Sequence, residues 1–239
     1  PLFDLPTQID ELGRSTAFTY DSAGLLLSKS TIDIATLQSR TWTYTYNSLG
    51  QVLTEDGPRT DVSDLTTYTY YNCNSGYQCG QLQTITNAAG QVTTYNTYDA
   101  HGQPTQFTDP NGIITTLAYD LRQRLAGTCI GGLLPACVGG ELTSIEYWPT
   151  GLLKKVTLPG GEFITYSYDA AHRLTGVADS AGNSVTYTLD AMGNRTTEDV
   201  RDSSSALRRT HNRVYSTLNR LYQDVNATST GGATTTYGY

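Results

Sequence analysis

Residues 41–50 of the chain read Thr41-Trp-Thr-Tyr-Thr-Tyr46-Asn47-Ser-Leu-Gly50. Over the first six positions Trp and Tyr alternate with Thr, and a period of two predicts a β-strand with one buried face and one polar face. The Asn-x-x-Gly that follows predicts a turn. An Asn or Asp side chain accepts a hydrogen bond from the amide two residues on, and Gly takes up the positive φ that closes the turn. The basic element is therefore a strand that runs into a tight turn.

This strand end and turn recur along the chain. The clearest copies are Tyr20-Asp21…Gly24, Tyr46-Asn47…Gly50 and Tyr98-Asp99…Gly102. Looser copies are Tyr119-Asp120…Gln123, Tyr147-Trp148…Gly151, Tyr168-Asp169…His172, Leu189-Asp190…Gly193 and Tyr215-Ser216…Asn219. Three intervals, from Tyr98 to Tyr119, from Tyr147 to Tyr168 and from Tyr168 to Leu189, are 21 residues, so the basic unit has 21 residues. Where Gly is missing, His172 and Asn219 are types enriched in the left-handed conformation, whereas Gln123 is not.

A second turn lies between successive copies. Asp109-Pro-Asn-Gly112 ends seven residues before Tyr119, and the same offset follows Asp10-Glu-Leu-Gly13, Leu158-Pro-Gly-Gly161 and Asp179-Ser-Ala-Gly182. Each unit then has two strands and two turns, which predicts an all-β fold, a repetitive antiparallel β-meander whose consecutive strands are hydrogen-bonded neighbours. Insertions lengthen the unit near residues 27–41, 72–80, 128–140 and 199–213. We expect the last of these, the least repetitive stretch, to be a long surface loop.

The composition points the same way. The 239 residues include 39 Thr and 18 Tyr, types that favour strands, which argues against a helical bundle. Leu, Ile, Val and Phe number only 48, and chains so poor in these residues often stay unfolded. Charged residues are only 15%, however, and Tyr adds apolar area, so we expect a folded chain. A net charge of −7 argues against nucleic acid as a partner, because phosphate backbones demand clustered Lys and Arg. There is no run of about 18 apolar residues, so we expect no membrane span, and no signal peptide is visible.

The 21-residue unit, the Tyr-Asp dipeptide and the Asp-x-x-Gly half-turn resemble the Rhs or YD-repeat family. That family includes bacterial Rhs proteins, the B and C components of insecticidal toxin complexes, and the teneurins. Its repeats form a β-strip that spirals into a hollow shell, and in many members the shell encloses a C-terminal toxic domain. The resemblance extends from about Asp10 to Tyr239.

The resemblance implies that residues 1–239 are a single YD-repeat array segment, an arc or spiral segment of such a shell, taken from a longer bacterial protein. The implied partners are the rest of the array and an enclosed C-terminal domain. Repeats contact mainly their neighbours, and a cut array exposes strand edges, so we also expect edge-mediated oligomers. The implied function is structural: a wall around a toxic cargo, with no enzymatic activity of its own.

The four cysteines fall where the array is interrupted. Cys73 and Cys79 flank one turn, and Cys129 and Cys137 bracket a seven-residue insertion. We favour two local disulfides, Cys73–Cys79 and Cys129–Cys137, each closing a short loop. The alternatives are a shared metal site or free thiols, but zinc ligand pairs usually have shorter spacing and no His lies close in the sequence. Disulfides would place the protein in an oxidising compartment, so we expect it to be secreted or at the cell surface.

Catalytic patterns are weak, and the sequence predicts no catalytic, cofactor or metal site. The aspartates recur at turn-opening positions, which turn capping explains better than acid–base chemistry. His101 and His172 lie inside Tyr-Asp turns and His211 in an Arg-rich polar stretch, so we expect solvated histidines. Nucleophile-elbow, zincin, P-loop and dinucleotide-binding motifs are all missing from the sequence.

Several aromatic residues could stack on sugar rings. The candidates are Trp42, Trp148 and Tyr77, the last in the Cys73–Cys79 loop, where function tends to concentrate. The alternative reading is that aromatic residues at strand spacing pack against neighbouring strands. A cell-surface carbohydrate-binding or adhesion module that recognises cell-surface glycans is therefore the second hypothesis beside the shell wall.

Overall fold

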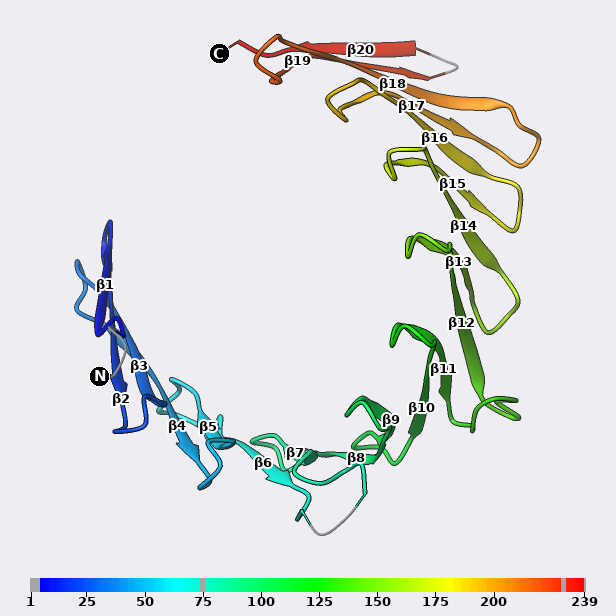
Figure 1. The fold of residues 1–239 in the computed structure, drawn as a ribbon. Coiled ribbons are helices and arrows are strands. Elements are labelled where there is room, and N and C mark those ends of the chain that lie inside the picture. Colours follow the sequence, from blue (N-terminus) through cyan, green and yellow to red (C-terminus); the bar gives the residue numbers. More distant parts are fainter. Residues whose placement is uncertain (1–4, 74–75, 229–230, 239) are drawn as a thin grey trace. The chain divides into compact units, whose positions relative to one another are not determined.

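The computed structural model describes residues 5–73, 76–228 and 231–238, and in these residues the chain forms twenty β-strands and no helix (Figure 1). The predicted all-β antiparallel meander is confirmed. The chain divides into two compact units, each of many repeats: residues 1–116 are the first unit and residues 117–239 the second. In the described ranges there is no helix long and apolar enough to cross a membrane.

In the first unit each strand pairs antiparallel with the next strand along the chain (Figure 1). Its strands are β1 (Gln8–Glu11), β2 (Arg14–Tyr20), β3 (Leu26–Asp33), β4 (Ser39–Tyr46), β5 (Val52–Asp56), β6 (Thr66–Tyr70), β7 (Leu82–Thr86), β8 (Val92–Tyr98) and β9 (Pro104–Thr108). Strand β10 (Ile114–Tyr119) pairs with β9 through residues 114–116 and continues into the second unit. Sequence neighbours are thus spatial neighbours throughout this unit.

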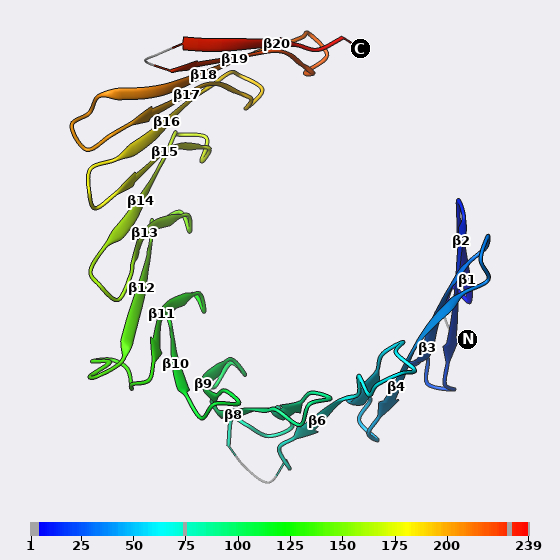
Figure 2. The same cartoon turned by 180° about the vertical axis from the view of Figure 1, so that it is seen from behind.

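The second unit repeats the arrangement, and Figure 2 shows its strands from behind in the same chain order. Its strands are β11 (Leu125–Ile130), β12 (Glu141–Tyr147), β13 (Leu153–Thr157), β14 (Phe163–Tyr168), β15 (Leu174–Asp179), β16 (Ser184–Leu189), β17 (Arg195–Arg201), β18 (Leu207–Tyr215), β19 (Leu221–Thr228) and β20 (Gly231–Thr236). Most are five to nine residues long, as turns spaced about ten residues apart require.

The predicted alternation of side chains is present, but the apolar face is only half-buried. In β4 the Trp42, Tyr44 and Tyr46 side chains are half-buried, while the intervening Thr residues are exposed. Among the described hydrophobic residues, only Cys129 and Cys137 are buried. The face that was predicted to be buried is therefore only half-buried. These strands are stabilised mainly by their own ladders and by cross-strand side-chain pairs, rather than by a conventional core.

The many threonines form cross-strand hydroxyl pairs on the polar face. The hydroxyl groups of Thr45 and Thr54 lie 2.5 Å apart, and those of Thr69 and Thr84 lie 2.7 Å apart. The same contact joins Thr19 to Ser28 at 2.6 Å and Thr97 to Thr105 at 2.7 Å. In every case the first residue directly precedes the tyrosine that ends its strand. The Thr-Tyr dipeptide therefore supplies one bond on each face of the sheet.

A β-bulge lies beside each of these tyrosines. Tyr46 pairs with Val52 while Thr45 pairs with Thr54, so Leu53 is an extra residue on the outgoing strand. The same shift occurs just before Tyr20, Tyr70, Tyr98, Tyr147, Tyr168, Leu189 and Tyr215. Bulges of this kind re-aim side chains and increase the local strand twist. The repeat thus includes a defined irregularity next to its turn.

The surface loop expected at residues 199–213 is not present. These residues instead complete β17 and begin β18, with a short turn opened by Asp202, whose Oδ1 accepts hydrogen bonds from the amides of Ser204 and Ala206. Cross-strand polar pairs hold the hairpin, such as the 2.7 Å bond from the Thr210 hydroxyl to Asp199. The prediction was wrong because a strand with polar residues on both faces has no hydrophobic period to detect.

The half-turn predicted to open at Asp10 is also different in the structure. Glu11 pairs directly with Arg14, so the hairpin loop consists only of Leu12 and Gly13, and Gly13 has φ +80°. The Asp10 carboxylate caps no turn amide, and it accepts hydrogen bonds from the side chains of Ser15 and Gln8. A two-residue hairpin loop is closed by residues with positive φ and needs no Asp cap. The Asp-x-x-Gly spacing is the same in both kinds of turn, so the sequence did not distinguish them.

Candidate functional site

The Tyr-Asp turns share one hydrogen-bond pattern. At Asp21, Oδ1 accepts from the amides of Ala23 and Leu25, each at 2.8 Å. The Gly24 amide donates to the Asp21 carbonyl, and the Asp21 amide donates to the Leu25 carbonyl. Side-chain oxygens make the equivalent bonds at Asn47, Asp99, Asp109, Asp120, Asp169, Asp179 and Asp190. All of these side chains are thereby occupied in shaping turns.

The residue that closes the turn is left-handed even where it is not Gly. Gln123, His172 and Asn219 have φ values of +64°, +64° and +62°. Gln is not enriched in this region, so the surrounding turn imposes the conformation on Gln123 at a cost of about 1–2 kcal/mol. Gly50 and Gly102, with φ near +79°, adopt the same conformation without that cost. The turn geometry is therefore kept when its sequence signature is lost.

A partner four residues after the turn-opening residue completes several turns, and it was not among the residues predicted from the sequence. Arg124 Nε and Arg173 Nε donate to the second carboxylate oxygens of Asp120 and Asp169, at 2.8 and 2.7 Å. Asn183 and Asn194 do the same for Asp179 and Asp190, while Asn47 and Asn87 donate to the amide oxygens of Gln51 and Gln91. The signal was visible in these turns, where Asp is followed at this distance by Arg or Asn, and Asn by Gln.

These bonds stabilise the ionised form of the turn carboxylates. The pKa of Asp120 is lowered by its hydrogen bond from Arg124, and that of Asp190 by its bond from Asn194. At Asp99 the main cause of the lowered pKa is the backbone amide of Gln103. At Asp202 the Ser204 hydroxyl, with further donors, lowers the pKa to about 2. The carboxylates therefore remain charged acceptors at physiological pH and are poorly suited to act as general acids.

Tyrosine hydroxyls link several repeats to the preceding repeat. Tyr46 Oη donates to the Leu26 carbonyl at 2.7 Å, and Tyr70 Oη donates to the Val52 carbonyl at 2.8 Å. In both cases the acceptor is the first strand residue after the preceding Tyr-Asp turn. Tyr98 and Tyr147 bond the carbonyls of Leu82 and Leu125 in the same way. The tyrosine therefore contributes its hydroxyl as well as its ring.

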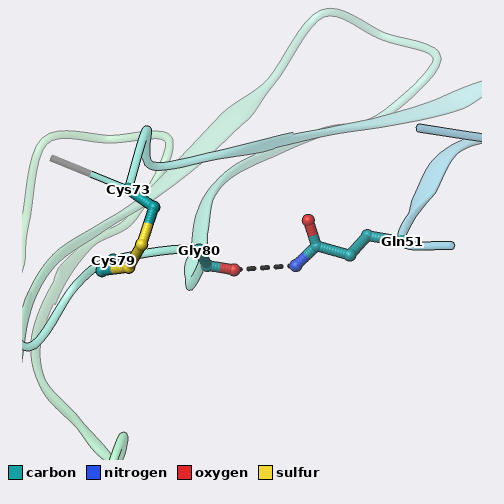
Figure 3. The surroundings of a disulfide bond; sticks show 4 residues. All are labelled: Gln51, Cys73, Cys79 and Gly80. Carbon is teal, nitrogen blue, oxygen red and sulfur yellow. Dashed lines mark hydrogen bonds between the residues drawn. A yellow bond between two sulfur atoms is a disulfide. The ribbon is translucent and has the colours of Figure 1, made fainter. Parts of the chain in front are cut away.

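The structure contains the predicted disulfide between Cys73 and Cys79. Its loop includes residues 74–75, which lie outside the described ranges. Figure 3 shows that Gly80, directly after Cys79, accepts a 2.7 Å hydrogen bond on its carbonyl from Gln51 Nε2. Gln51 belongs to the turn that Asn47 opens, so the disulfide loop is tied to the neighbouring Tyr-Asn turn.

The second predicted disulfide, between Cys129 and Cys137, is present and buried. Two glycines let the chain fold closely around it. A Cβ atom on Gly132 would lie 3.0 Å from Cys129 Sγ, and one on Gly140 would lie 2.6 Å from the Ile130 carbonyl oxygen. The insertion at residues 128–140 is therefore a compact structure built around its sulfur atoms.

A groove of about 450 Å³ lies beside Trp148, one of the aromatic residues proposed from the sequence. The Trp148 side chain is 41% exposed, and its Nε1 donates to the Tyr166 carbonyl at 3.3 Å, which fixes the ring. Lys154 Nζ lies 5.5 Å from the centre of the same ring. The other lining residues are Pro149, Thr150, Leu152, Ser167, Tyr168, Asp169 and His172. A fixed, half-exposed indole beside hydroxyl groups is suited to stacking on an apolar ring face.

A larger groove of about 670 Å³ lies beside Trp42 in the first unit. Its lining includes the three basic residues Arg14, Lys29 and Arg40. The sequence motifs include Trp42 but not these cations, which are spread over 26 residues of the chain. Antiparallel pairing of β2, β3 and β4 brings them together. Their proximity depends on strand register, which no local motif encodes.

The remaining candidates form no reactive site. Tyr77 is exposed in the Cys73–Cys79 loop, where it contributes to neither groove. His101 lies near Asp99, and His172 closes a turn. His211 is half-buried in β18, contrary to the expected solvated position, and its Nδ1 lies 2.9 Å from Arg213 Nη2. No group of three or more His, Cys, Asp or Glu side chains that could hold a metal ion occurs in the described ranges.

The comparisons with known proteins agree with this geometry. A family model described as RHS Repeat matches residues 80–112, 98–128 and 147–184. Residues 80–128 and 147–184 of the chain thus match the RHS repeat. The matched ranges contain the turns of Asp99, Asp120 and Asp169 with their bonding patterns. Within these ranges the regular turn network coincides with the matched repeat.

Solved structures with a similar fold are crystal structures of TcdB2-TccC3. The form without its hypervariable C-terminal region matches with a TM-score of 0.58 and 16% identity, over 94% of this chain and 14% of that one. The form named TcdB2-TccC3-TEV matches with a TM-score of 0.50 and 15% identity, over 97% and 16% of the two chains. The chain therefore spans about one seventh of these proteins, and the likeness concerns the fold. No curated protein matches its sequence.

Proposed function

We propose that this Rhs-repeat array is a wall segment of a shell that encloses a C-terminal domain of its parent protein. Its role is structural and not catalytic: the wall keeps the enclosed domain from its targets by physical exclusion. The observation that supports this most directly is the repeated link between units, in which a tyrosine hydroxyl of one unit bonds the strand carbonyl of the preceding one. Such links make a continuous strip from small repeats.

The proposed partners are the remaining repeats of the same array and the enclosed domain. The proposed location is outside the cytoplasm of a bacterium, either secreted or at the cell surface, because both cysteine pairs form disulfides and disulfides persist in oxidising compartments. Edge-mediated oligomers remain a prediction that light scattering on the purified chain would check.

Limited proteolysis of the full-length parent protein tests the wall. The first requirement is that the reading frame continues into a further domain after the array; without one, the proposal fails. A native parent protein should then protect this domain from protease. Replacing both Cys129 and Cys137 with Ala should open the wall and expose the domain to cleavage. Equal cleavage of the domain in the native protein and as an isolated domain would contradict enclosure.

A second candidate function is glycan binding in the groove beside Trp148. The specific observation that favours it is a fixed indole, 41% exposed, at a groove of about 450 Å³ whose lining includes hydroxyl groups. Stacking on a sugar ring and hydrogen bonds to its hydroxyls would both be available there. A glycan array in which the wild type binds neutral oligosaccharides and Trp148→Ala does not would support this function. Unchanged binding by Trp148→Ala, or an array with no binding, would reject the site.

A further inference from the structure

A carboxylate with no cationic partner among the described residues lies on the half-buried face of the first unit. Glu55 belongs to β5, and its direct cross-strand partners are Tyr44 of β4 and Thr66 of β6. Glu55 is half-buried, and it takes part in no ion pair in the described part of the chain. Lys29, a basic residue on the same face, lies over the Trp42 ring instead, with its Nζ 5.5 Å from the ring centre. The fold therefore places a negative charge among aromatic side chains without pairing it.

Two tyrosines flank this carboxylate. Tyr44 lies on one neighbouring strand and Tyr68 on the other, where the Tyr68 hydroxyl donates to Glu55 Oε2 at 3.4 Å. An O–H···O bond is ordinarily about 2.7–2.8 Å long, so this bond holds the carboxylate only weakly. Burial, followed by the charge of Glu55, raises the pKa of Tyr44 and the pKa of Tyr68. Both hydroxyl groups therefore lie in the field of the same carboxylate.

The two flanking rings are not used by the repeat itself. Tyr46 and Tyr70 bond carbonyls of the preceding repeat through their hydroxyls, whereas the Tyr44 hydroxyl bonds nothing in the described residues. Neighbouring strands are about 4.8 Å apart, so β4 and β6 are separated by roughly 10 Å with β5 between them. In the described ranges no ring-to-ring contact joins Tyr44 and Tyr68. The Glu55 carboxylate thus lies between two aromatic side chains that do not stack on one another.

These three side chains suit a cation with an apolar surface. An aromatic face attracts a cation through its quadrupole, and a carboxylate attracts it through its charge. A calcium ion is a poor fit, because it takes about six to eight oxygen ligands and a single carboxylate is present here. We propose that Glu55, Tyr44 and Tyr68 bind a quaternary ammonium group, with the cation on the carboxylate and its methyl groups against the two rings. This site lies outside the turn network and does not depend on the wall function.

Choline is the probe for this site, because it carries a trimethylammonium group. In an NMR titration of the whole 239-residue chain, choline should shift the backbone amides of Tyr44, Glu55 and Tyr68 with saturation. The uncharged isostere of choline, in which carbon replaces nitrogen, should shift them little, and sodium chloride at the same concentration should not shift them. Equal responses to choline and its isostere would overturn the proposal. A response to sodium as large as to choline, or no saturable shift, would overturn it as well.

Side-chain variants test the two kinds of contact. Glu55→Gln should weaken choline binding by about tenfold, because the charge is removed and the shape is kept. Tyr44→Leu should weaken it by about fivefold, because one aromatic face is lost. The matched control is Glu146→Gln: Glu146 is also a strand glutamate, but its carboxylate is paired with Lys154 Nζ at 3.0 Å. This control should leave the affinity unchanged, and circular dichroism establishes that each variant folds. Unchanged binding by folded Glu55→Gln, or an equal loss in the control, would reject the site.

An alkaline titration separates ligand binding from a structural effect. A bound cation offsets the charge of Glu55, so choline should lower the raised pKa of Tyr44 and of Tyr68. Phenolate absorbance with and without choline would show the earlier ionisation, and the double variant Tyr44→Phe, Tyr68→Phe should abolish the difference. A titration curve that saturating choline does not change would contradict the placement of the cation beside Glu55.

Discussion

The tyrosine that ends the strand before a Tyr-Asp or Tyr-Asn turn makes two kinds of interaction through one side chain. Its ring lies on the half-buried face of the sheet, and its hydroxyl reaches a carbonyl of the preceding unit, as Tyr46 does at Leu26. The sequence alone identified the ring as packing but could not reveal the hydroxyl bond. That acceptor is about twenty residues away, and only the strand register and the bulge bring it within reach. The preference for Tyr over Phe at these positions follows.

Replacing Tyr46 with Phe should lower the free energy of unfolding by about 1 kcal/mol, because one hydrogen bond is lost while the ring is kept. Urea denaturation followed by circular dichroism would measure the change. Tyr44→Phe is the matched control, since Tyr44 lies on the same face of the same strand and its hydroxyl bonds nothing in the described residues. A loss in the control as large as in Tyr46→Phe would show that the hydroxyl bond to Leu26 contributes nothing specific.

Tyr98 should ionise late in an alkaline titration. Burial, with the nearby Tyr95 and Tyr71, raises the pKa of Tyr98 to about 12. An unfolded tyrosine ionises near 10, so the folded state binds the proton more tightly, and the resulting stability is fully present below pH 10 and lost as the pH rises towards 12. Phenolate absorbance should show a late-titrating tyrosine that is missing in Tyr98→Phe. An identical titration curve in that variant would contradict the assignment.

At the scale of the elements, the turn was the most predictable part of the chain. Its Asp or Asn cap acts within four residues, so the local sequence contains all the required information. The hairpin of β17 and β18 was missed for the opposite reason. Its strands are held by pairs such as Arg209 with Glu198, which become neighbours only after the register is set. Local chemistry was therefore predictable, whereas polar cross-strand pairing was not.

The turn carboxylates should make the protein sensitive to acid. Donors in the turns lower the pKa values of Asp99, Asp120, Asp169, Asp179, Asp190 and Asp202, and that of Asp202 falls to about 2. A depressed carboxyl pKa stabilises the fold above the unfolded value near 4, and this contribution is lost as the pH falls through the folded value. The urea midpoint should therefore be constant from pH 7 to 5 and fall between pH 4 and 2.

The variant Asp202→Asn tests one of these contributions. It should start from a lower stability and then lose less of it than the wild type between pH 4 and 2, because position 202 no longer takes up a proton. Urea titrations at each pH would compare the two slopes. Parallel slopes in this range would show that Asp202 does not contribute to the acid transition.

The two disulfides should differ in their effect on stability. Each closes a short loop, for which chain entropy predicts roughly 2–3 kcal/mol of stabilisation. Cys129 and Cys137 are also buried against Gly132 and Gly140, so replacing this pair with Ala removes packing as well as the bond. We expect the double variant of this pair to lose more stability than the Cys73→Ala, Cys79→Ala double variant. Equal losses measured by urea denaturation would show that the buried packing adds nothing.

At the scale of the whole molecule, the composition already indicated that a large hydrophobic core does not stabilise this fold. A chain poor in Leu, Ile, Val and Phe cannot fill a large core, and the described hydrophobic residues are indeed mostly half-buried. What composition could not indicate is the grouping of distant residues on one face. The basic groove beside Trp42 exists because β2, β3 and β4 align three isolated cations. The position of this groove therefore could not be predicted from local sequence motifs.

The exposed area leads to a prediction for the unfolding thermodynamics. The chain exposes 15309 Å², whereas a compact protein of 26.0 kDa exposes about 10,500 Å². An unfolded chain of this mass exposes about 38,000 Å², so folding buries about a fifth less area here than in a compact protein. Because the heat capacity change scales with that area, calorimetry summed over all transitions should give about 2.6 kcal/mol/K instead of about 3.2 kcal/mol/K.

The same reduction should appear in the dependence of the unfolding free energy on urea, which also scales with the area exposed. A heat capacity change at the compact value would contradict the prediction, since it requires the half-buried faces to be covered in solution. A concentration series separates the two ways in which this could happen. If the value rises with protein concentration, a second copy covers these faces through association; if it is high at every concentration, the chain itself buries more apolar surface than its strands do here.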